Sequence, residues 1–292
     1  MNTENYEVLL EKVFTNLAPS LSEDWPKLAA TRAEGAYLYT ADGREYLDFT
    51  SGIGVTNLGH NHPYVLNAAI EQMKKFSHSA VGITLHEPLL RLTEVLPTVM
   101  PEGMDMFFFG NSGSEAVEGA LKLARYVSRR PGIIAFRGGF HGRNFGSTSV
   151  TSVKSKYRLH YEPMLPGVYF TEYANPYRCP LGETAADAVA WSRMSLENVF
   201  NHLIAPSEVA AILVEPVQGE GGYIVPPVEF LHDLRRTCDE HGILLIFDEV
   251  QSGFGRTGQM FAAQTFGVRP DIMAIAKGIA TGFPLRATVA RL

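Results

Sequence analysis

Short apolar runs that recur between helical segments constrain this chain more than any other feature. Runs that are apolar throughout are typical of strands buried on both faces, and strands that alternate with helices form parallel sheets. The sequence therefore predicts an α/β protein with a mostly parallel central sheet and flanking helices. The runs are 104–109, 133–136, 168–170, 209–214, 243–247 and 271–276.

The segment before these runs has a different pattern. AYLYT and REYLDF flank the turn signal Ala41, Asp42 and Gly43, which predicts a β-hairpin over 36–49. Pro63 predicts the first turn of a helix through YVLNAAIEQMKKF. We expect residues 1–60 to form an N-terminal segment belonging to a small domain, and residues 61–292 to form the large α/β domain.

Charge and composition argue against several classes of protein. The 25 basic and 31 acidic residues give a net charge of −6, which disfavours nucleic-acid binding. Apolar stretches such as VAAILV are too short to span a bilayer, and the acidic start MNTENYEVLLEK lacks the pattern of an export signal. Two cysteines, Cys179 and Cys238, cannot form a disulfide framework. We expect a cytoplasmic protein with neither nucleic-acid nor membrane partners.

The first strand run ends at a turn that could bind an anion. The residues GNSGS (110–114) precede a helix that begins near Glu115. Unpaired amides and the helix dipole favour an anion such as phosphate there, and glycine allows close approach. The alternative is a capping box, Ser112 with Glu115, which needs no ligand. The residues alone leave both explanations open.

Acidic residues follow another strand, at Asp248 and Glu249. Burying such carboxylates is costly unless they are partnered, so solvated loop acids are the simpler explanation of this motif by itself. Glycines at 253, 255 and 258 formally match a dinucleotide site. That match is weak because five residues separate the strand from the first glycine, whereas a nicotinamide site has its tight turn at the strand end.

Lys277 follows the last apolar run. Desolvation would lower its pKa and leave a nucleophile able to form an imine, while the alternative is a lysine that extends to the surface. Glu215 and Glu220, after the run 209–214, could serve acid/base chemistry or solvate a turn. His60 and His62 lack a nearby third ligand, so we expect no metal site.

A glycine-rich loop, GGFHGRNFG (138–146), adds Phe140 and Arg143 after the strand 133–136. Phe140 could be a core residue and Arg143 a surface charge. Together with the other strand-end residues, however, they make a phosphate grip, an aromatic ring, an aspartate and a desolvated lysine. That combination is what pyridoxal 5′-phosphate (PLP) requires.

At this point the chain resembles a known family, the class III (ω-amino acid) PLP-dependent aminotransferases of fold type I, and most closely their 4-aminobutyrate and ornithine branch. The resemblance runs from the hairpin near residue 36 to the end of the chain. It rests on NSGSEAVEGALKLAR, FHGR, EPVQGEGG, FDEVQSGFGRTG and AKGIATGFPL, in the family's order and spacing.

The resemblance implies a role for each residue that matches a family motif. Lys277 corresponds to the Schiff-base lysine, and Asp248 to the partner of the pyridine nitrogen. The resemblance also assigns two substrate residues, Arg143 as a binder of the substrate carboxylate and Glu220 as a gate that pairs with a later arginine. The other cofactor residues that it implies are Gly113 and Ser114 for the phosphate, Phe140 and Val250 for the two faces of the ring, and Gln251 near the phenolic oxygen.

The sequence also departs from the family. Family members continue into a small C-terminal domain that carries a phosphate-binding threonine, donated across the dimer, and an arginine for the α-carboxylate. We therefore expect a truncated member, with an incomplete large domain and little turnover by itself. Arg286 stands where the family usually has a small residue.

The resemblance implies a ping-pong aminotransferase that moves an amino group from a 4-aminobutyrate-like amine to a 2-oxo acid such as 2-oxoglutarate, as a homodimer or higher homo-oligomer. One alternative is a racemase or aminomutase of the same family, and another is an inactive truncated fragment. From a different class, a nicotinamide-dependent oxidoreductase would require a helix that begins directly at Gly253, with no acid beneath it.

Overall fold

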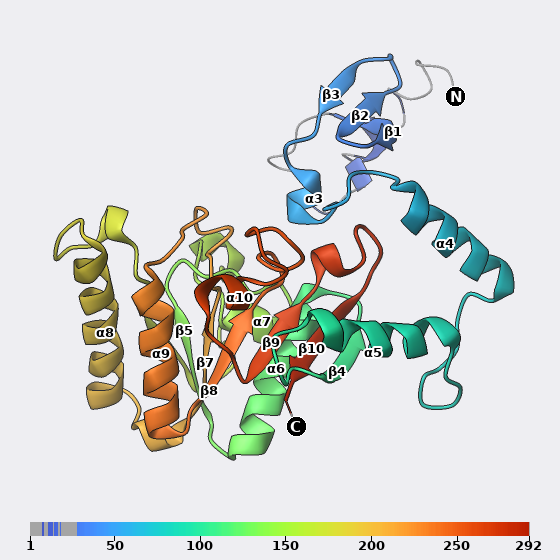
Figure 1. Ribbon diagram of the computed structural model, residues 1–292. Helices are drawn as coiled ribbons and strands as arrows, with labels where there is room; N and C mark the ends of the chain where they lie inside the picture. Colours follow the sequence, from blue (N-terminus) through green and yellow to red (C-terminus); the bar gives the residue numbers. More distant parts are fainter. Residues whose placement is uncertain (1–7, 9–10, 14, 17, 19–27, 292) are drawn as a thin grey trace. The chain divides into compact units, whose positions relative to one another are not determined.

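The computed structural model describes residues 8, 11–13, 15–16, 18 and 28–291, and packing divides the chain into two units, Met1–Ser79 and Ala80–Leu292 (Figure 1). Residues 61–79 fall within the first unit, whereas the sequence placed them with the large domain. The division into domains after residue 60 stays a prediction.

The first unit contains an antiparallel sheet of three strands, in the order β1-β2-β3. Strands β2 and β3 form the predicted hairpin, with Tyr37 opposite Leu47. The predicted helix begins at Pro63 as expected. The sequence did not predict β1, whose residues ATRAE show no apolar alternation. The elements are β1 (Ala30–Glu34), β2 (Tyr37–Thr40), β3 (Glu45–Leu47), α3 (Ser51–Gly54) and α4 (Pro63–Lys75).

The second unit is built on a seven-stranded sheet, in the order β4-β10-β9-β8-β7-β5-β6. All six predicted runs form strands of this sheet, and the strands from β9 to β6 are mutually parallel. Only β10 runs antiparallel to its neighbours, β4 and β9. The mostly parallel α/β fold is thus confirmed. The strands are β4 (Met106–Gly110), β5 (Gly132–Phe136), β6 (Val168–Thr171), β7 (Val209–Val214), β8 (Leu244–Asp248), β9 (Ile272–Ile275) and β10 (Arg286–Ala290).

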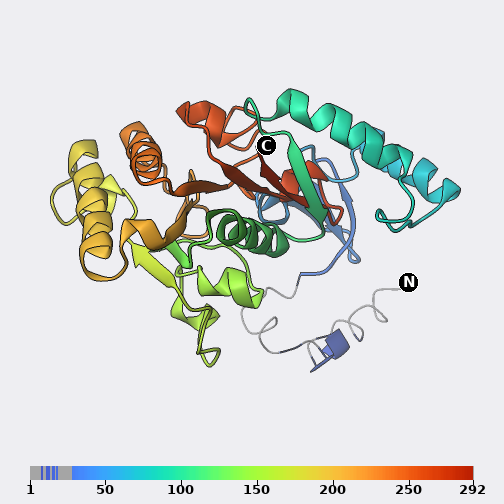
Figure 2. The ribbon, with the colours of Figure 1, turned by 90° about the horizontal axis from the view of Figure 1, so that it is seen from below.

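Helices cover both faces of this sheet (Figure 2). Successive strand residues point to opposite faces, so Ala211 and Leu213 pack in the cluster with α6, while Ile212 and Val214 pack in the cluster with α8 and α9. No helix in the described part of the chain is long and apolar enough to cross a membrane. The helices are α5 (Glu87–Val99), α6 (Gly113–Ser128), α7 (Phe145–Ser149), α8 (Ala185–His202), α9 (Val228–His241) and α10 (Ala262–Phe266).

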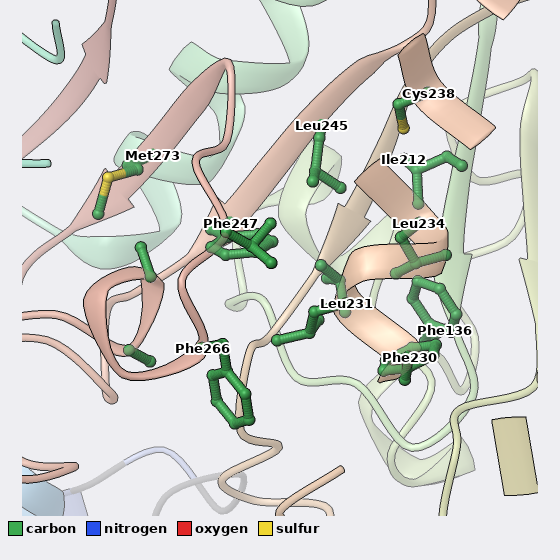
Figure 3. Packing of buried hydrophobic residues seen from close by; sticks show 14 of the residues in the cluster. Phe136, Ile212, Phe230, Leu231, Leu234, Cys238, Leu245, Phe247, Phe266 and Met273 are labelled. Atoms are coloured by element: carbon green, nitrogen blue, oxygen red, sulfur yellow. The ribbon is translucent and has the colours of Figure 1, made fainter. Parts of the chain in front are cut away.

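The larger core cluster lies between the sheet and α9 (Figure 3). Phe136 of β5 meets Phe230 of α9 edge to face, with ring centroids 5.4 Å apart. Both cysteines are free thiols, and burial raises the pKa of the Cys238 thiol well above its ordinary value. Cys238 is therefore a structural residue of this core and not a reactive one.

A leucine pair tests the contribution of this core. Leu231 of α9 has no exposed surface, so Leu231→Ala should lower the free energy of unfolding by about 2 to 5 kcal/mol through lost burial and a residual cavity. Leu203 is 57% exposed, and Leu203→Ala should cost less than about 1 kcal/mol. Urea unfolding of the two variants measures the difference. Equal losses would contradict this assignment of the core.

Candidate active site

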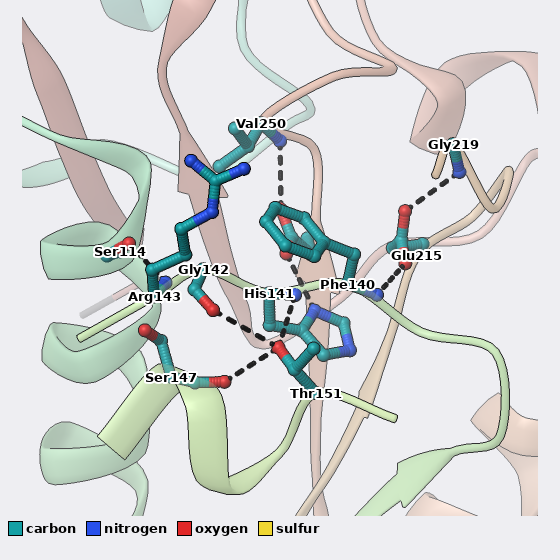
Figure 4. Close-up of polar contacts among 11 residues, drawn as sticks. Ser114, Phe140, His141, Gly142, Arg143, Ser147, Thr151, Glu215, Gly219 and Val250 are labelled. Carbon is teal, nitrogen blue, oxygen red and sulfur yellow. Dashed lines mark hydrogen bonds and ion pairs between the residues drawn. The ribbon is translucent and has the colours of Figure 1, made fainter. Parts of the chain in front are cut away.

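Loops that follow β4, β5, β7, β8 and β9 bring the predicted site residues to one edge of the sheet. Figure 4 shows Ser114, Phe140 and Val250 there. These strands run in the same direction, so their carboxyl ends meet. Close contacts join the loops. A Cβ atom on Gly113 would lie 2.9 Å from Cγ1 of Val250 and 3.7 Å from Cβ of Ala276, so only glycine fits at the start of α6.

The turn after β4 contains both features that the sequence left open. The capping box exists, because the amide of Glu115 donates to Oγ of Ser112 at 3.3 Å and the amide of Ser112 donates to Oε2 of Glu115 at 2.7 Å. The amides of Gly113 and Ser114 occupy the first two helical positions, which have no intrahelical acceptor. The capping box therefore leaves these two amides available to an anion. Oγ of Ser114 accepts the amide of Arg143 at 3.1 Å.

Asp248, the last residue of β8, is buried and paired. Its Oδ2 lies 2.7 Å from Nδ1 of His141, and its Oδ1 accepts the amide of Val250 at 3.1 Å. Burial alone would lower the pKa of His141, but the hydrogen bond and charge of Asp248 raise it overall. The explanation of Asp248 as a solvated loop acid is therefore wrong. Nε2 of His141 is buried and has no hydrogen-bond partner among the described residues.

Glu215 ties two of the loops together. Its Oε1 accepts the amide of Phe140 at 2.8 Å, and its Oε2 accepts the amide of Gly219 at 2.9 Å. Burial raises the pKa of this carboxyl to about 7. Glu215 therefore connects the two loops through hydrogen bonds. The interpretation of Glu215 as a residue that only solvates a turn is wrong. It positions the ring of Phe140 over the same edge of the sheet.

Lys277 follows β9 in a left-handed conformation, with φ of 50°. Such backbone strain in a residue other than glycine is typical of functional sites. Burial lowers the pKa of its amine, and Asp248, Glu215 and Glu220 oppose that shift. The amine therefore loses its proton at a lower pH than an ordinary lysine, which makes it the better nucleophile.

A group of charged and aromatic side chains lies beside this edge of the sheet. Glu220 pairs with Lys154, whose Nζ lies 2.9 Å from its Oε1, and Tyr157 donates to the same oxygen at 3.4 Å. The Arg143 guanidinium lies 5.8 Å from the centroid of the Phe140 ring and 5.7 Å from that of Tyr157. The structure thus brings Arg143 and Glu220 into one neighbourhood, through Tyr157.

Glu249 and the glycines after it do not form a nucleotide site. Glu249 is buried and accepts the amides of Ala262 at 3.1 Å and Ala263 at 2.7 Å, so it caps α10. The helix that follows this loop begins at Ala262 and not at Gly253, and both strand-end acids are buried. The dinucleotide interpretation of the three glycines is therefore wrong. In the same turn, the side chain of Gln251 packs against Gly219.

The sequence did not predict that several other residues would lie near this site. His141 was visible only as a histidine in the loop after β5, and nothing local showed that it would meet Asp248, 107 positions later. Lys154 and Tyr157 lie at the start and the end of a one-turn 3-10 helix, η1 (Ser155–Tyr157), which is too short to leave a periodic pattern in the sequence. Elsewhere, in the first unit, Nε2 of His60 lies 2.8 Å from Oδ2 of Asp48.

Comparison with known proteins gives a consistent match. The family profile described as Aminotransferase class-III matches residues 20–292. A 4-aminobutyrate aminotransferase of Escherichia coli is 44% identical over 264 residues, which cover 90% of this chain and 60% of that protein. An alanine/serine racemase of Pyrococcus horikoshii is 38% identical over 269 residues, 90% of this chain and 57% of that protein.

Solved structures give the same match. A thermostable (S)-enantioselective omega-transaminase from Thermomicrobium roseum has a TM-score of 0.91 and 32% identity, covering 100% of this chain and 67% of its own. A taurine:2-oxoglutarate aminotransferase from Bifidobacterium kashiwanohense, solved with PLP and glutamate, has a TM-score of 0.91 and 32% identity over 98% and 65% of the two chains. This chain spans about 60% of the length of the curated relatives it matches.

Glu249 gives a pH-dependent test of the site's framework. Burial raises its pKa to about 7, so the folded state binds its proton more tightly than the unfolded state. Its contribution to stability is complete below the ordinary pKa and is lost as the pH rises through about 7. Relative to Glu249→Gln, which cannot titrate, the wild type should lose up to about 3 kcal/mol between pH 4.5 and 7. Denaturant unfolding at several pH values measures this, and a constant difference would contradict it.

Asp248→Asn tests the buried pair directly. The amide carries no charge, so burial should dominate and the pKa of His141 should fall below that of the wild type. NMR titration of the His141 ring, assigned with His141→Gln, measures the shift. An unchanged His141 titration would show that the two side chains are not coupled.

Proposed function

This chain belongs to the class III aminotransferase family, and from that premise we propose that the protein transfers an amino group, with PLP as cofactor, from an ω-amino acid resembling 4-aminobutyrate to a 2-oxo acid such as 2-oxoglutarate. One observation carries the proposal. A partly desolvated Lys277, a buried Asp248 backed by His141 and the open start of α6 lie at one edge of the sheet.

The residues at this edge fit PLP. Gly113 lies so close to Val250 and Ala276 that a side chain at this position would meet them, so no side chain of residue 113 covers the amides at the start of the helix. Asp248 would face the ring nitrogen, and Lys277 would hold the aldehyde carbon. When bound, PLP supplies an electron sink for the bonding electrons of the substrate carbon. The remaining contacts would come from Gly113 and Ser114 to the phosphate, Phe140 and Val250 to the ring faces, and Gln251 to the phenolic oxygen.

Asp248 and His141 keep the ring nitrogen protonated. An anionic carboxylate holds a proton at that nitrogen, and the hydrogen bond from His141 fixes the orientation of the carboxylate. Burial lowers the pKa of His141, but the hydrogen bond and the charge of Asp248 raise it overall, so the two buried side chains stabilise each other. Asp248→Asn removes this support while retaining the shape of the site.

Lys277 moves the proton that leaves the substrate carbon. A general base works best when its pKa lies near the working pH, and burial lowers the pKa of the Lys277 amine in that direction. The adjacent charges of Asp248, Glu215 and Glu220 limit the shift, so the amine can both take up and return a proton.

The charged and aromatic side chains beside this edge support an acidic substrate. The Arg143 guanidinium lies beside the rings of Phe140 and Tyr157, where a substrate carboxylate could reach it. Glu220 is neutralised by Lys154 and so repels such a substrate less. Arg143 as carboxylate binder and Glu220 as gate are proposals on this basis.

A racemase is the second candidate, because one relative that matches 90% of this chain is an alanine/serine racemase. The same lysine and aspartate serve both reactions. Product analysis separates them, since a transaminase yields an oxo acid and a racemase yields the opposite stereoisomer.

We further propose a cytoplasmic homodimer or higher homo-oligomer. Strand β4 is an edge strand, and its residues Met106 and Phe108 are 49% and 66% exposed. Exposed apolar side chains on an edge strand support a protein surface that covers them. Sedimentation measures the oligomeric state.

Reductive labelling tests the proposed function. With PLP and borohydride, the pyridoxyl group should attach to Lys277, because burial makes its amine easier to deprotonate than an ordinary lysine amine. Lys277→Ala should lose the label, because the amine that attacks the aldehyde is then absent. The control is Lys122→Ala, an exposed lysine on α6, which should behave as the wild type. Stoichiometric label on another lysine would overturn the assignment.

A further inference from the structure

Two side chains of opposite charge, Arg143 and Glu220, contact the same residue, Tyr157. The Arg143 guanidinium lies 5.7 Å from the centroid of the Tyr157 ring and 5.8 Å from that of Phe140, close enough for a cation–π attraction to each. Figure 4 shows the Arg143 side chain extended beside the Phe140 ring. The hydroxyl of Tyr157 donates to Oε1 of Glu220 at 3.4 Å. Opposite charges that flank one side chain attract each other, and a guanidinium and a carboxylate match in geometry.

The ion pair that this attraction favours is not formed. Among the described residues, Arg143 has no carboxylate partner, and its guanidinium lies against the two aromatic rings. Glu220 pairs instead with Lys154, whose Nζ lies 2.9 Å from Oε1. Lys154 directly precedes η1, and Tyr157 ends it. One short turn therefore supplies both the ammonium and the hydroxyl that contact the same carboxylate oxygen.

This choice of partner matters for the binding of a carboxylate by Arg143. A pair between Arg143 and Glu220 would occupy the N–H groups of the guanidinium and cancel its charge, so an incoming carboxylate would first have to displace Glu220. Lys154 reduces this competition because its ammonium holds the carboxylate of Glu220. The side chains of Lys154 and Glu220 are 51% and 35% exposed, so solvent limits the strength of their pair and its effect is a severalfold one.

We propose that Lys154 is a specificity-determining residue that holds Glu220 away from Arg143 and so keeps the guanidinium available to a carboxylate of the substrate. Lys154 acts through Glu220 and does not contact the substrate. The inference rests on the proposed function for the identity of the ligand. It deepens that function by naming the substrate class, amines and oxo acids with a carboxylate remote from the reacting carbon.

Modification of Arg143 by phenylglyoxal tests the arrangement without cofactor or turnover. The reagent attacks guanidinium groups, and an ion pair protects them because it occupies their N–H groups. Lys154→Gln should slow the modification of Arg143 by about two- to fivefold, because Glu220 is then free to pair with it. Lys154→Gln/Glu220→Gln should restore the wild-type rate. Mass spectrometry of the digested protein follows Arg143 alone.

The matched control is Lys156→Gln, which removes an exposed lysine from the same turn and should leave the rate unchanged. This control separates the pairing of Glu220 from a general loss of positive charge.

Protection by an added carboxylate gives the second measurement. Glutarate should slow the modification of Arg143 in the wild type and in the double variant, because it pairs with the free guanidinium. In Lys154→Gln, half-maximal protection should require about two- to fivefold more glutarate, because Glu220 competes for the same group. Glutaramide, which carries no charge, should give no protection.

Three results would overturn the inference. The first is equal modification of Arg143 in the wild type and in Lys154→Gln. The second is a double variant as slow as Lys154→Gln, which would assign the effect to the lost lysine charge and not to Glu220. The third is glutarate protection that is the same with and without Lys154. Lys154 is half-exposed, so its replacement leaves the core intact.

These measurements also separate the inference from the proposed function. Arg143 reactivity that depends on Lys154, in a protein whose Lys277 takes no pyridoxyl label, would support the inference and overturn the proposed function. Labelled Lys277 with Arg143 reactivity indifferent to Lys154 would do the reverse.

Discussion

The hydrogen bond between Asp248 and His141 is the interaction on which the candidate site depends. Both side chains are buried, and an unpaired carboxylate at the end of β8 would be costly there. The 2.7 Å contact removes that cost and joins the loop after β5 to the loop after β8. It can form because β5 and β8 flank β7 in a parallel arrangement, which aligns their carboxyl ends. The order and direction of the strands therefore determine which side chains meet at this edge of the sheet.

Two further buried carboxylates stiffen the same edge. Glu215 binds two backbone amides and fixes the loop that carries Phe140, while Glu249 binds two amides at the start of α10. Backbone donors satisfy these acids without adding positive charge, so burial raises the pKa of each to about 7. Only Asp248 is paired with a titratable side chain, His141. Acidic side chains thus connect the loops at two positions, Glu215 and Glu249, and at the third, Asp248, an acidic side chain faces the proposed ring nitrogen.

The sequence predicts the strands well because burial on both faces leaves a local signal, as in VAAILV of β7. It does not predict β10, whose first residue is a charged arginine and whose neighbour β4 (Met106–Gly110) lies far earlier in the sequence. The same limit applies to the site. Strand ends indicate Asp248 and Lys277, but the meeting of His141 with Asp248 spans 107 positions and depends on tertiary packing. The three glycines after β8 match the spacing of a dinucleotide site, but the helix that follows them begins at Ala262 and not at the first glycine. Their spacing therefore suggested a site that the structure does not form.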